Sequence, residues 1–268
     1  MAGCEPFLEA DIAPFLALTE EEGWVCDRWE FEFLLDSFSQ GCFVRREGGN
    51  ALGYITSIKY GRSGWIGNLL VQPGARRRGI GRELMERAVS ALLKSGVETV
   101  WLTASEEGAG LYQKLGFLPI DSIYRWSGKA ALNQALKPAP LDIESIRAVD
   151  RVGWGDRRET LLQVTCGRGR LHTSSGGFLC CQEWRSGTQL GPWSCLIGAQ
   201  AGLLLDQVLT DGDDDVFLDV PAGNFAAAAL LIERGFSVKG SSALMYLGDH
   251  PLYQPGTIYA LASMGSMG

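Results

Sequence analysis

Apolar positions in the first part of the chain change from a helical to a strand-like spacing. Residues 7–18 are apolar at a loosely helical interval, and residues 26–38 show that interval more clearly. The segment 42–60 reads as two strands joined by the turn Gly48-Gly49-Asn50, and residues 64–73 predict a third strand that stops at a Pro-Gly pair. Two helices followed by a three-stranded meander are therefore predicted.

A helix, a buried strand and a second helix are predicted next. Apolar residues between 81 and 95 recur at spacings of three and four, and Gly96 stands where a C-terminal cap belongs. Residues 97–104 have the composition of a buried strand, and residues 106–115 predict a short helix ended by Gly116. This order predicts an α/β (α+β) fold with a mixed, mostly antiparallel sheet flanked by helices.

The second half of the sequence repeats this layout after a segment of different composition. Residues 127–145 hold two prolines and no core period, which predicts a linker, and a run of short strands is expected after them. A helix near 198–209, a strand at 216–220 and another short helix follow. The pair Gly116-Phe117 recurs as Gly235-Phe236 at an offset of 119 residues. We therefore predict two copies of one fold, divided as residues 1–135 and 136–268.

Composition narrows the class of protein. The chain of 268 residues is 46% apolar and 21% charged, which is typical of globular proteins. No apolar run reaches the ~18 residues that cross a bilayer, and the N-terminus lacks the basic and apolar regions of a signal peptide. The seven cysteines include no CxxC pair, and the two histidines are far apart. We expect a soluble, cytoplasmic protein with no membrane partner and no bound metal.

The charge of the chain argues against nucleic acid as the main partner and leaves a cationic substrate as an alternative. A formal net charge of −7 does not suit nucleic acid as the main partner, because phosphate contacts need a basic surface. Seven acidic residues lie between positions 20 and 36, against one base, Arg28. They form either a solvated helix face or a surface that attracts a cationic substrate.

The stretch LLVQPGARRRGIGREL, residues 69–84, joins an apolar strand to a helix through arginines and glycines. The unpaired N–H groups and the dipole at a helix start stabilise an anion, and Gly79 and Gly81 permit close approach of the backbone to a ligand. The side chains of Arg76, Arg77, Arg78 and Arg82 add positive charge. The stretch suits a pyrophosphate, yet it contains no P-loop string, and Leu84 replaces the third glycine of a dinucleotide fingerprint.

What remains is RxxGxG, and it resembles the coenzyme A signature of the GNAT N-acetyltransferase superfamily. The positions that match the pattern V-x-P-x-x-R-x-x-G-x-G-x-x-L are Val71, Pro73, Arg76, Gly79, Gly81 and Leu84. The segment LYQKLGF, residues 111–117, resembles the last helix of that family's motif. The resemblance implies an acetyltransferase with acetyl-CoA as co-substrate and, because the layout occurs twice, a tandem GNAT protein.

The resemblance also implies roles for particular residues. The pyrophosphate would be held by Arg76, Arg77, Arg78, Gly79, Ile80, Gly81 and Arg82. The strand from Asn68 to Val71 would line the pantetheine arm, and the N–H of Leu70 or Val71 would polarise the thioester carbonyl. Tyr112 would be the general acid that protonates the departing thiolate and would face the coenzyme.

Two positions depart from the family pattern. Many relatives carry a glutamate as general base on the strand before the coenzyme loop, where this chain has residues 65–68 without a carboxylate. Asn68 can position a water or the substrate but cannot take up a proton, so Glu30, Glu32 or a chain of waters is left as the base. Glu106 stands where relatives often have an asparagine that contacts the pantetheine arm.

The second copy lacks the residues that would bind a coenzyme. Leu231 replaces the tyrosine, and no basic residue lies between Arg185 and Arg234. It is therefore expected to be a degenerate GNAT-like lobe that either walls the acceptor site or only supports the first lobe. The predicted function is N-acetylation of a small-molecule amine or a peptide N-terminus. The alternatives are an acyl-CoA-binding or sensing protein with little catalysis, and transfer of a longer acyl chain.

Overall fold

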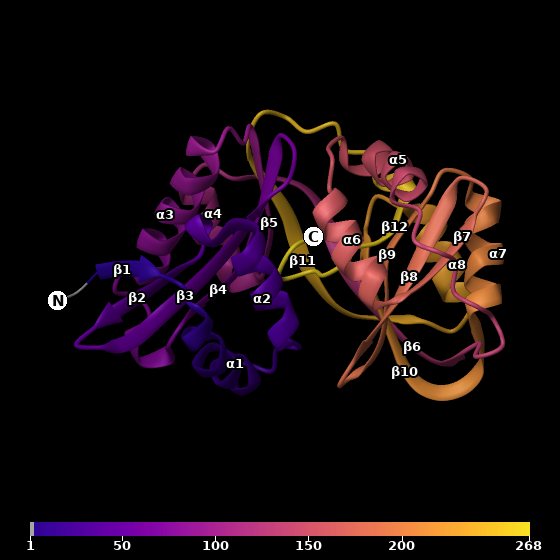
Figure 1. Ribbon diagram of the computed structural model, residues 1–268, viewed down its shortest axis with the longest axis horizontal. Helices are drawn as coiled ribbons and strands as arrows, with labels where there is room; N and C mark the ends of the chain where they lie inside the picture. The colour runs from indigo at the N-terminus through magenta and orange to yellow at the C-terminus, as the bar shows by residue number, and fades with distance from the viewer. Residues whose placement is uncertain (1–2) are drawn as a thin grey trace.

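The computed structural model describes residues 3–268 and places them in two lobes of strands and helices (Figure 1). The first lobe contains β1 (Gly3–Pro6), η1 (Glu9–Asp11), α1 (Ile12–Glu21), α2 (Arg28–Phe38), η2 (Ser39–Gly41), β2 (Phe43–Glu47), β3 (Asn50–Lys59), β4 (Ser63–Val71), η3 (Pro73–Ala75), α3 (Ile80–Lys94), β5 (Thr99–Ala104) and α4 (Glu106–Lys114). β6 (Leu118–Leu132) then leads out of it.

The second lobe repeats much of that order. It contains α5 (Ile143–Trp154), α6 (Glu159–Arg168), β7 (Arg170–Ser174), β8 (Gly177–Trp184), β9 (Gly187–Cys195), α7 (Gly198–Val208), β10 (Leu209–Pro221) and α8 (Phe225–Glu233). The chain closes with β11 (Ser237–Gly248), η4 (Pro255–Thr257) and β12 (Ile258–Ala260). No helix among residues 3–268 is long and apolar enough to cross a membrane.

The predicted fold class is confirmed, and two local predictions are wrong. Both lobes have a mixed, mostly antiparallel sheet with helices packed on it. The linker predicted at 127–145 begins too early, because residues 127–132 complete β6 through hydrogen bonds to β10. The run of strands predicted after it overlooks α5 and α6. The division at residue 135 falls between β6 and α5 and stays a prediction.

One sheet connects the two lobes because each half of the chain contributes one strand to the sheet of the opposite lobe. The strand order is β1-β2-β3-β4-β5-β11-β6-β10-β9-β8-β7. β11 belongs to the second half of the chain but pairs with β5, whereas β6 belongs to the first half and pairs with β10. β11 and β6 also pair with each other, antiparallel, at the centre of the sheet. In Figure 1, β11 crosses to the left-hand lobe and β6 to the right-hand one.

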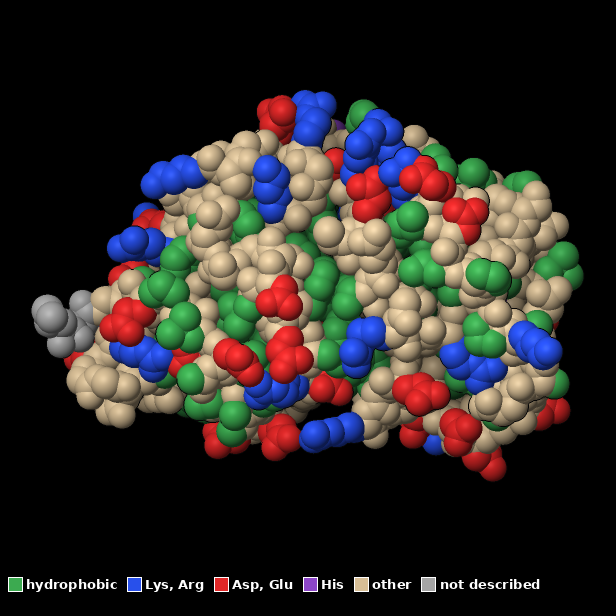
Figure 2. Space-filling model, viewed as in Figure 1, with side chains coloured by type: hydrophobic (Ala, Val, Ile, Leu, Met, Phe, Trp, Pro, Cys, Tyr) green, Lys and Arg blue, Asp and Glu red, His purple; other side chains and the backbone are tan. Residues whose placement is uncertain are grey.

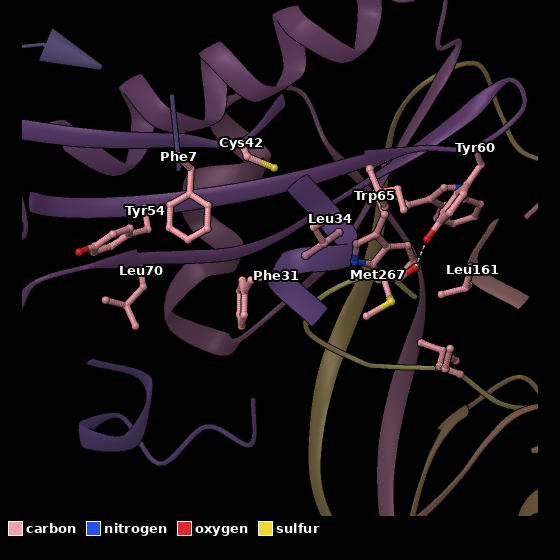
Figure 3. Close-up of a cluster of buried hydrophobic side chains, with 14 of the residues drawn as sticks. Phe7, Phe31, Leu34, Cys42, Tyr54, Tyr60, Trp65, Leu70, Leu161 and Met267 are labelled. Atoms are coloured by element: carbon pink, nitrogen blue, oxygen red, sulfur yellow. Dashed lines mark hydrogen bonds between the residues drawn. The ribbon is translucent and has the colours of Figure 1, made fainter. Parts of the chain in front are cut away.

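Hydrophobic packing also joins the lobes. The indole of Trp154 on α5 lies edge-on to those of Trp65 and Trp101 in the first lobe, with ring centroids 6.1 and 5.7 Å apart. The end of the chain reaches the same core, where the hydroxyl of Tyr60 donates to the carbonyl of Met267 at 2.5 Å (Figure 3). The first-lobe core is therefore completed by residues from the second half.

Each lobe has a pair of parallel strands that separate. β4 and β5 pair only at residues 63–65, and β9 and β10 only where Thr188 and Gln189 meet Val216 and Phe217. The second gap is filled by the chain itself, since β12 pairs with β9 and the N–H of Leu261 donates to the carbonyl of Asp219 at 2.8 Å. A cavity lies at the gap beside β4, where residues 66–69 of β4 and Leu102 and Thr103 of β5 line it.

We expect the full-length protein to unfold in a single cooperative transition. Separate domains usually unfold separately, but here neither sheet is complete without a strand from the other half. Urea denaturation followed by far-UV circular dichroism and by tryptophan fluorescence should give coincident curves. Two resolved transitions would show that each half is stable without the exchanged strand.

Candidate active site

A cavity of about 290 Å³ lies between the lobes, on one face of the shared sheet. Its floor comes from five neighbouring strands, through Thr103, Ser242, Arg125, Phe217 and Gln189 on β5, β11, β6, β10 and β9. Its walls are residues 23–26 before α2, residues 66–69 of β4, Tyr112 of α4, Trp184 of β8 and residues 263–266. The strand exchange therefore builds the floor, and both lobes enclose the cavity.

The glycine-arginine turn lies between η3 and α3, where the sequence placed it. Gly79 caps α3 with a φ of +83°, and Arg77 also has a positive φ, of 62°. Arg76 donates to the carbonyl of Val71 at 3.1 Å and pairs with Glu22, while Arg78 pairs with Glu47 at 2.6 Å. Such half-exposed pairs contribute only ~0–1 kcal/mol, so a polyanion can replace the carboxylates at little cost.

Gly81 lies in the first turn of α3 and has space beside its Cα. A Cβ at this position would lie 3.6 Å from Leu111 Cδ2 and 3.7 Å from Val71 Cγ2, which are ordinary van der Waals distances. The fold itself therefore tolerates a Cβ at Gly81, and an alanine there can test ligand approach separately from folding.

Tyr112 lines the cavity from α4, and its role as general acid stays a prediction. Its ring packs edge-on against Phe117, with centroids 6.1 Å apart, and over Gly108, where a Cβ would lie 3.1 Å from Tyr112 Cε2. Burial raises the pKa of the Tyr112 hydroxyl to about 12. The hydroxyl therefore keeps its proton through the neutral range and is a donor, not a base.

Asn68 lies at a bulge in β4, with a positive φ of 56°. Its Nδ2 donates to Thr56 Oγ1 at 2.8 Å, and its Oδ1 accepts from Ser266 Oγ at 3.3 Å. Its backbone N–H donates to the carbonyl of Gly265 at 3.3 Å. The C-terminal tail, residues 261–268, approaches β4 so closely that a Cβ on Gly67 would lie 2.3 Å from the carbonyl oxygen of Gly265. Asn68 is thus held in place by a segment that is remote in sequence.

Leu70 and Val71, which are predicted to supply a backbone donor, are not among the residues that line the cavity. Residues 66–69 face the cavity, whereas Leu70 is buried in the first-lobe core (Figure 3) and Val71 follows it at the end of β4. β4 has left β5 well before this point. Which N–H of β4 meets the thioester stays a prediction.

Glu30 on α2 is almost fully buried, at 1% exposure. One carboxylate oxygen accepts from the N–H of Asp27 at 3.0 Å, which completes the capping box of α2, and the hydroxyl of Ser266, which donates to Asn68 Oδ1, also lies close to the carboxylate. Burial raises the pKa of Glu30 to about 7, although these hydrogen bonds oppose the shift. Ser266 thereby links Glu30 to Asn68. Glu32, the other proposed base, is exposed and pairs with Arg28 at 2.6 Å.

The acidic side chains of segment 20–36 are not among the residues that line the cavity. Within residues 3–268 the segment's contribution to the lining is Gly23, Trp24, Val25 and Cys26, none of them a carboxylate. Figure 2 shows acidic side chains over the part of this face that contains α1 and α2. Most of these residues therefore form a solvated face.

Sequence reasoning left open whether the second lobe walls the site, and it did not identify the residues that β6 and the second half contribute. Arg125, Trp184, Gln189, Phe217 and residues 263–266 carry no motif and lie far from β4 in the chain. The exchange of β6 and β11 brings these residues together, and the local spacing of apolar and polar residues does not predict such an exchange.

In the second lobe, the protein's own residues occupy both the position that corresponds to Tyr112 and the gap between the parallel strands. Leu231 is fully buried where the first lobe has Tyr112. Asn224 caps α8 by accepting from the N–H of Ala227 at 2.9 Å, and its Nδ2 donates to the carbonyl of Ile258 at 2.9 Å. The asparagine thus binds the chain's own β12. Among residues 3–268, no three His, Cys, Asp or Glu side chains come together as a metal site.

Comparison with known proteins matches both halves to one family. A model described as the acetyltransferase (GNAT) family matches residues 7–117, and one described as an acetyltransferase (GNAT) domain matches residues 146–260. The chain is 24% identical over 271 residues to YitH of Bacillus subtilis (strain 168), an uncharacterized N-acetyltransferase, with 95% of each protein covered.

Solved structures share the fold over almost the whole chain. A candidate acetyltransferase from Pyrococcus horikoshii superposes with a TM-score of 0.83 at 22% identity, covering 99% of this chain and 95% of that one. A tandem GNAT protein from the clavulanic acid biosynthesis pathway superposes with a TM-score of 0.60 at 16% identity, covering 94% and 99%.

We expect Glu30→Gln to change how stability depends on pH. The pKa of Glu30 is about 7 in the folded protein and ~4.3 in the unfolded chain, so the folded state binds more protons in between. The wild type should therefore lose stability, up to ~3 kcal/mol, as the pH rises from 5 to 8, and the variant should lose less.

Urea midpoints at pH 5, 6, 7 and 8 measure this difference. Glu32→Gln is the matched control, because that carboxylate is exposed and should leave the slope unchanged. Parallel profiles for wild type and Glu30→Gln would contradict the raised pKa.

Proposed function

Since this chain belongs to the GNAT acetyltransferase family and carries a GNAT unit in each half, we propose that it is an acetyl-CoA-dependent N-acetyltransferase. Its one reaction centre is the cavity between the lobes. The observation that carries this proposal is that Tyr112 and the β4 bulge line one side of that cavity, and that the start of α3 lies next to them, since a Cβ on Gly81 would lie 3.8 Å from Leu69 and 3.6 Å from Leu111.

The coenzyme would bind along the start of α3 and the opened edge of β4. The N–H groups of Gly79, Ile80 and Gly81 would meet the pyrophosphate, and the guanidinium groups of Arg76, Arg77, Arg78 and Arg82 would neutralise it. Arg76 and Arg78 would exchange their half-exposed carboxylate partners for phosphate oxygens. The acetyl group would then lie at the cavity, beside residues 66–69.

Transfer would proceed by direct attack of the amine nitrogen on the thioester carbon. A backbone N–H of β4, that of Leu70 or Val71, would stabilise the negative charge that develops on the carbonyl oxygen. As the C–S bond breaks, the hydroxyl of Tyr112 would give its proton to the sulfur. The apolar surroundings that raise the pKa of Tyr112 also disfavour a free thiolate at the same place, so a neighbouring donor is favoured there.

The proton lost by the amine would pass to Glu30. A carboxylate with a pKa of about 7 is well matched to a general base at neutral pH. Glu30 does not itself line the cavity, so the proton would travel through the hydroxyl of Ser266, which now donates to Asn68 Oδ1. This hydroxyl would turn to the Glu30 carboxylate, give it its own proton and take up the proton of the amine. Asn68 would hold the amine or a water at the cavity wall.

The second lobe would shape the acceptor site and not bind a second coenzyme. Its equivalent gap is filled by β12, and its α7 begins without arginines. The acceptor would be a small-molecule amine or a peptide N-terminus, and we propose the cytoplasm as its location. A second candidate function is acyl-CoA binding with little catalysis, which the lack of a carboxylate among the cavity-lining residues favours.

We expect acetyl-CoA to bind with a stoichiometry near one per chain, and Gly81→Glu to abolish that binding. The added carboxylate would obstruct the helix start and repel the phosphates. Isothermal titration calorimetry on the wild type and on Gly81→Glu measures both effects.

Gly81→Ala separates the steric from the electrostatic effect, because the fold accepts a Cβ there. It should weaken binding less than the glutamate does. Absence of binding by the wild type would overturn the proposed function, and two coenzymes per chain would show that the second lobe is intact.

We expect Tyr112→Phe to lower kcat about 10²-fold while the affinity for acetyl-CoA changes little. The ring would keep its packing on Gly108 and Phe117, and only the proton donor would be lost. Steady-state kinetics with an accepted amine test this, with Tyr124→Phe on the partly exposed part of β6 as control. Unchanged turnover by Tyr112→Phe would remove the hydroxyl from the mechanism.

A further inference from the structure

The cavity has one permanently charged group among its described lining residues, the guanidinium of Arg125. Its Nε and Nη2 donate to the two carboxylate oxygens of Asp219, each at 2.8 Å. Asp219 is fully buried and also accepts from Gln189 Nε2 at 3.5 Å. The carboxylate therefore lies behind the guanidinium and fixes its orientation, which reduces the entropy lost when Arg125 binds a ligand.

Arg125 keeps donors for a ligand. Within residues 3–268 its Nη1 donates to no protein acceptor, and its side chain is about one third exposed, at 33%. The guanidinium also lies over the ring of Phe217, 5.2 Å from the centroid. An anionic group that enters the cavity would meet a preoriented donor on an otherwise uncharged surface.

The walls around Arg125 are largely aromatic. Trp24 and Trp184 line the cavity with Phe217, and Trp184 is supported from behind by Trp29, with ring centroids 5.8 Å apart. Aromatic walls favour an apolar body in the ligand. A cationic end would find no carboxylate among these residues and would be repelled by Arg125.

The sheet sets the separation between Arg125 and the transfer centre. Thr103 on β5 lies at the β4 side of the cavity, and Arg125 on β6 lies two strands further along, beyond β11. Neighbouring strands are ~4.8 Å apart, so these positions are ~10 Å apart. Because Arg125 pairs with β10, its guanidinium is directed away from β5. A ligand that touches both places must be extended.

We propose that the acceptor is a primary amine that carries a carboxylate several bonds away across an apolar body, and that Arg125 binds this carboxylate. This inference rests on the proposed function, since it places the amine at the β4 side of the cavity. Acceptors of this class include ω-amino acids and short apolar peptides with a free C-terminus. The Arg125–Asp219 pair is neutral overall, which suits a singly charged carboxylate better than a phosphate.

Matched acceptors test the proposal on the wild-type protein. The pairs are 6-aminohexanoate with 6-aminohexanamide, and the dipeptide Ala-Phe with its C-terminal amide, each assayed with acetyl-CoA. We expect kcat/KM to be about 10-fold to 100-fold higher for the acid of each pair, because a hydrogen-bonded ion pair is lost in the amide. Equal values, or a preference for the amides, would overturn the inference while leaving the transferase activity established.

Variants assign the preference to Arg125. Arg125→Gln alone leaves Asp219 buried without its cation and can prevent folding, so the paired change Arg125→Gln with Asp219→Asn is used as well. The paired variant should turn over acid and amide alike. The control is Arg234→Gln with Asp206→Asn, a similar two-point pair at 2.6 and 2.8 Å outside the cavity, which should keep the preference. A preference that survives in the Arg125 pair would refute the assignment.

Direct binding separates this inference from the proposed function. Calorimetry with N-acetyl-6-aminohexanoate and its amide requires no turnover. Tighter binding of the acid, lost in the Arg125 pair, would support the carboxylate site even in a protein that acetylates nothing. If the protein acetylates amines that lack a carboxylate but binds neither compound, the carboxylate site alone would be overturned.

Discussion

Strands β6 and β11 each complete the sheet of the opposite lobe, and they pair with each other where the lobes meet. Their hydrogen bonds fix the position of one lobe relative to the other, because a continuous sheet cannot pivot at a paired strand without breaking its ladder. The same two strands form the centre of the cavity floor, through Ser242 and Arg125. One arrangement of hydrogen bonds therefore determines both the joining of the lobes and the shape of the site.

The two lobes have diverged mainly at the gap between their parallel strands. In the second lobe, β12 hydrogen-bonds to β9, and Asn224 binds the carbonyl of Ile258, so protein backbone occupies the gap. In the first lobe, the tail that follows, residues 261–268, reaches β4 near the bulge and contacts Asn68 and Gly67, and the cavity lies beside these contacts. A single C-terminal segment thus fills the gap of one lobe and completes the active-site wall of the other.

In the proposed mechanism, the tail also connects the cavity to a general base that takes the place of the missing carboxylate on β4. Ser266 connects the amide of Asn68 to Glu30, which is buried on α2 and has a pKa of about 7. Under the proposed mechanism, a carboxylate behind the cavity wall would receive the proton through the hydroxyl of Ser266, and no negative charge would stand beside the thioester. It also leaves Arg125 as the charged group that an acceptor meets.

The sequence by itself determined the local elements and the position of the loop, residues 76–82, that is proposed to bind the coenzyme. Helical periodicity located α2 and α3, and the RxxGxG string with LYQKLGF located the loop and Tyr112, since these depend on residues close together in the chain. Local pattern failed at residues 127–132, whose strand character comes from pairing with β10. Only the tertiary structure decided which half supplies each central strand, that Glu30 and not Glu32 is buried beside Ser266, and that Arg125 faces the cavity. These features depend on contacts between residues roughly a hundred or more positions apart, and spacing along the chain carries no record of such contacts.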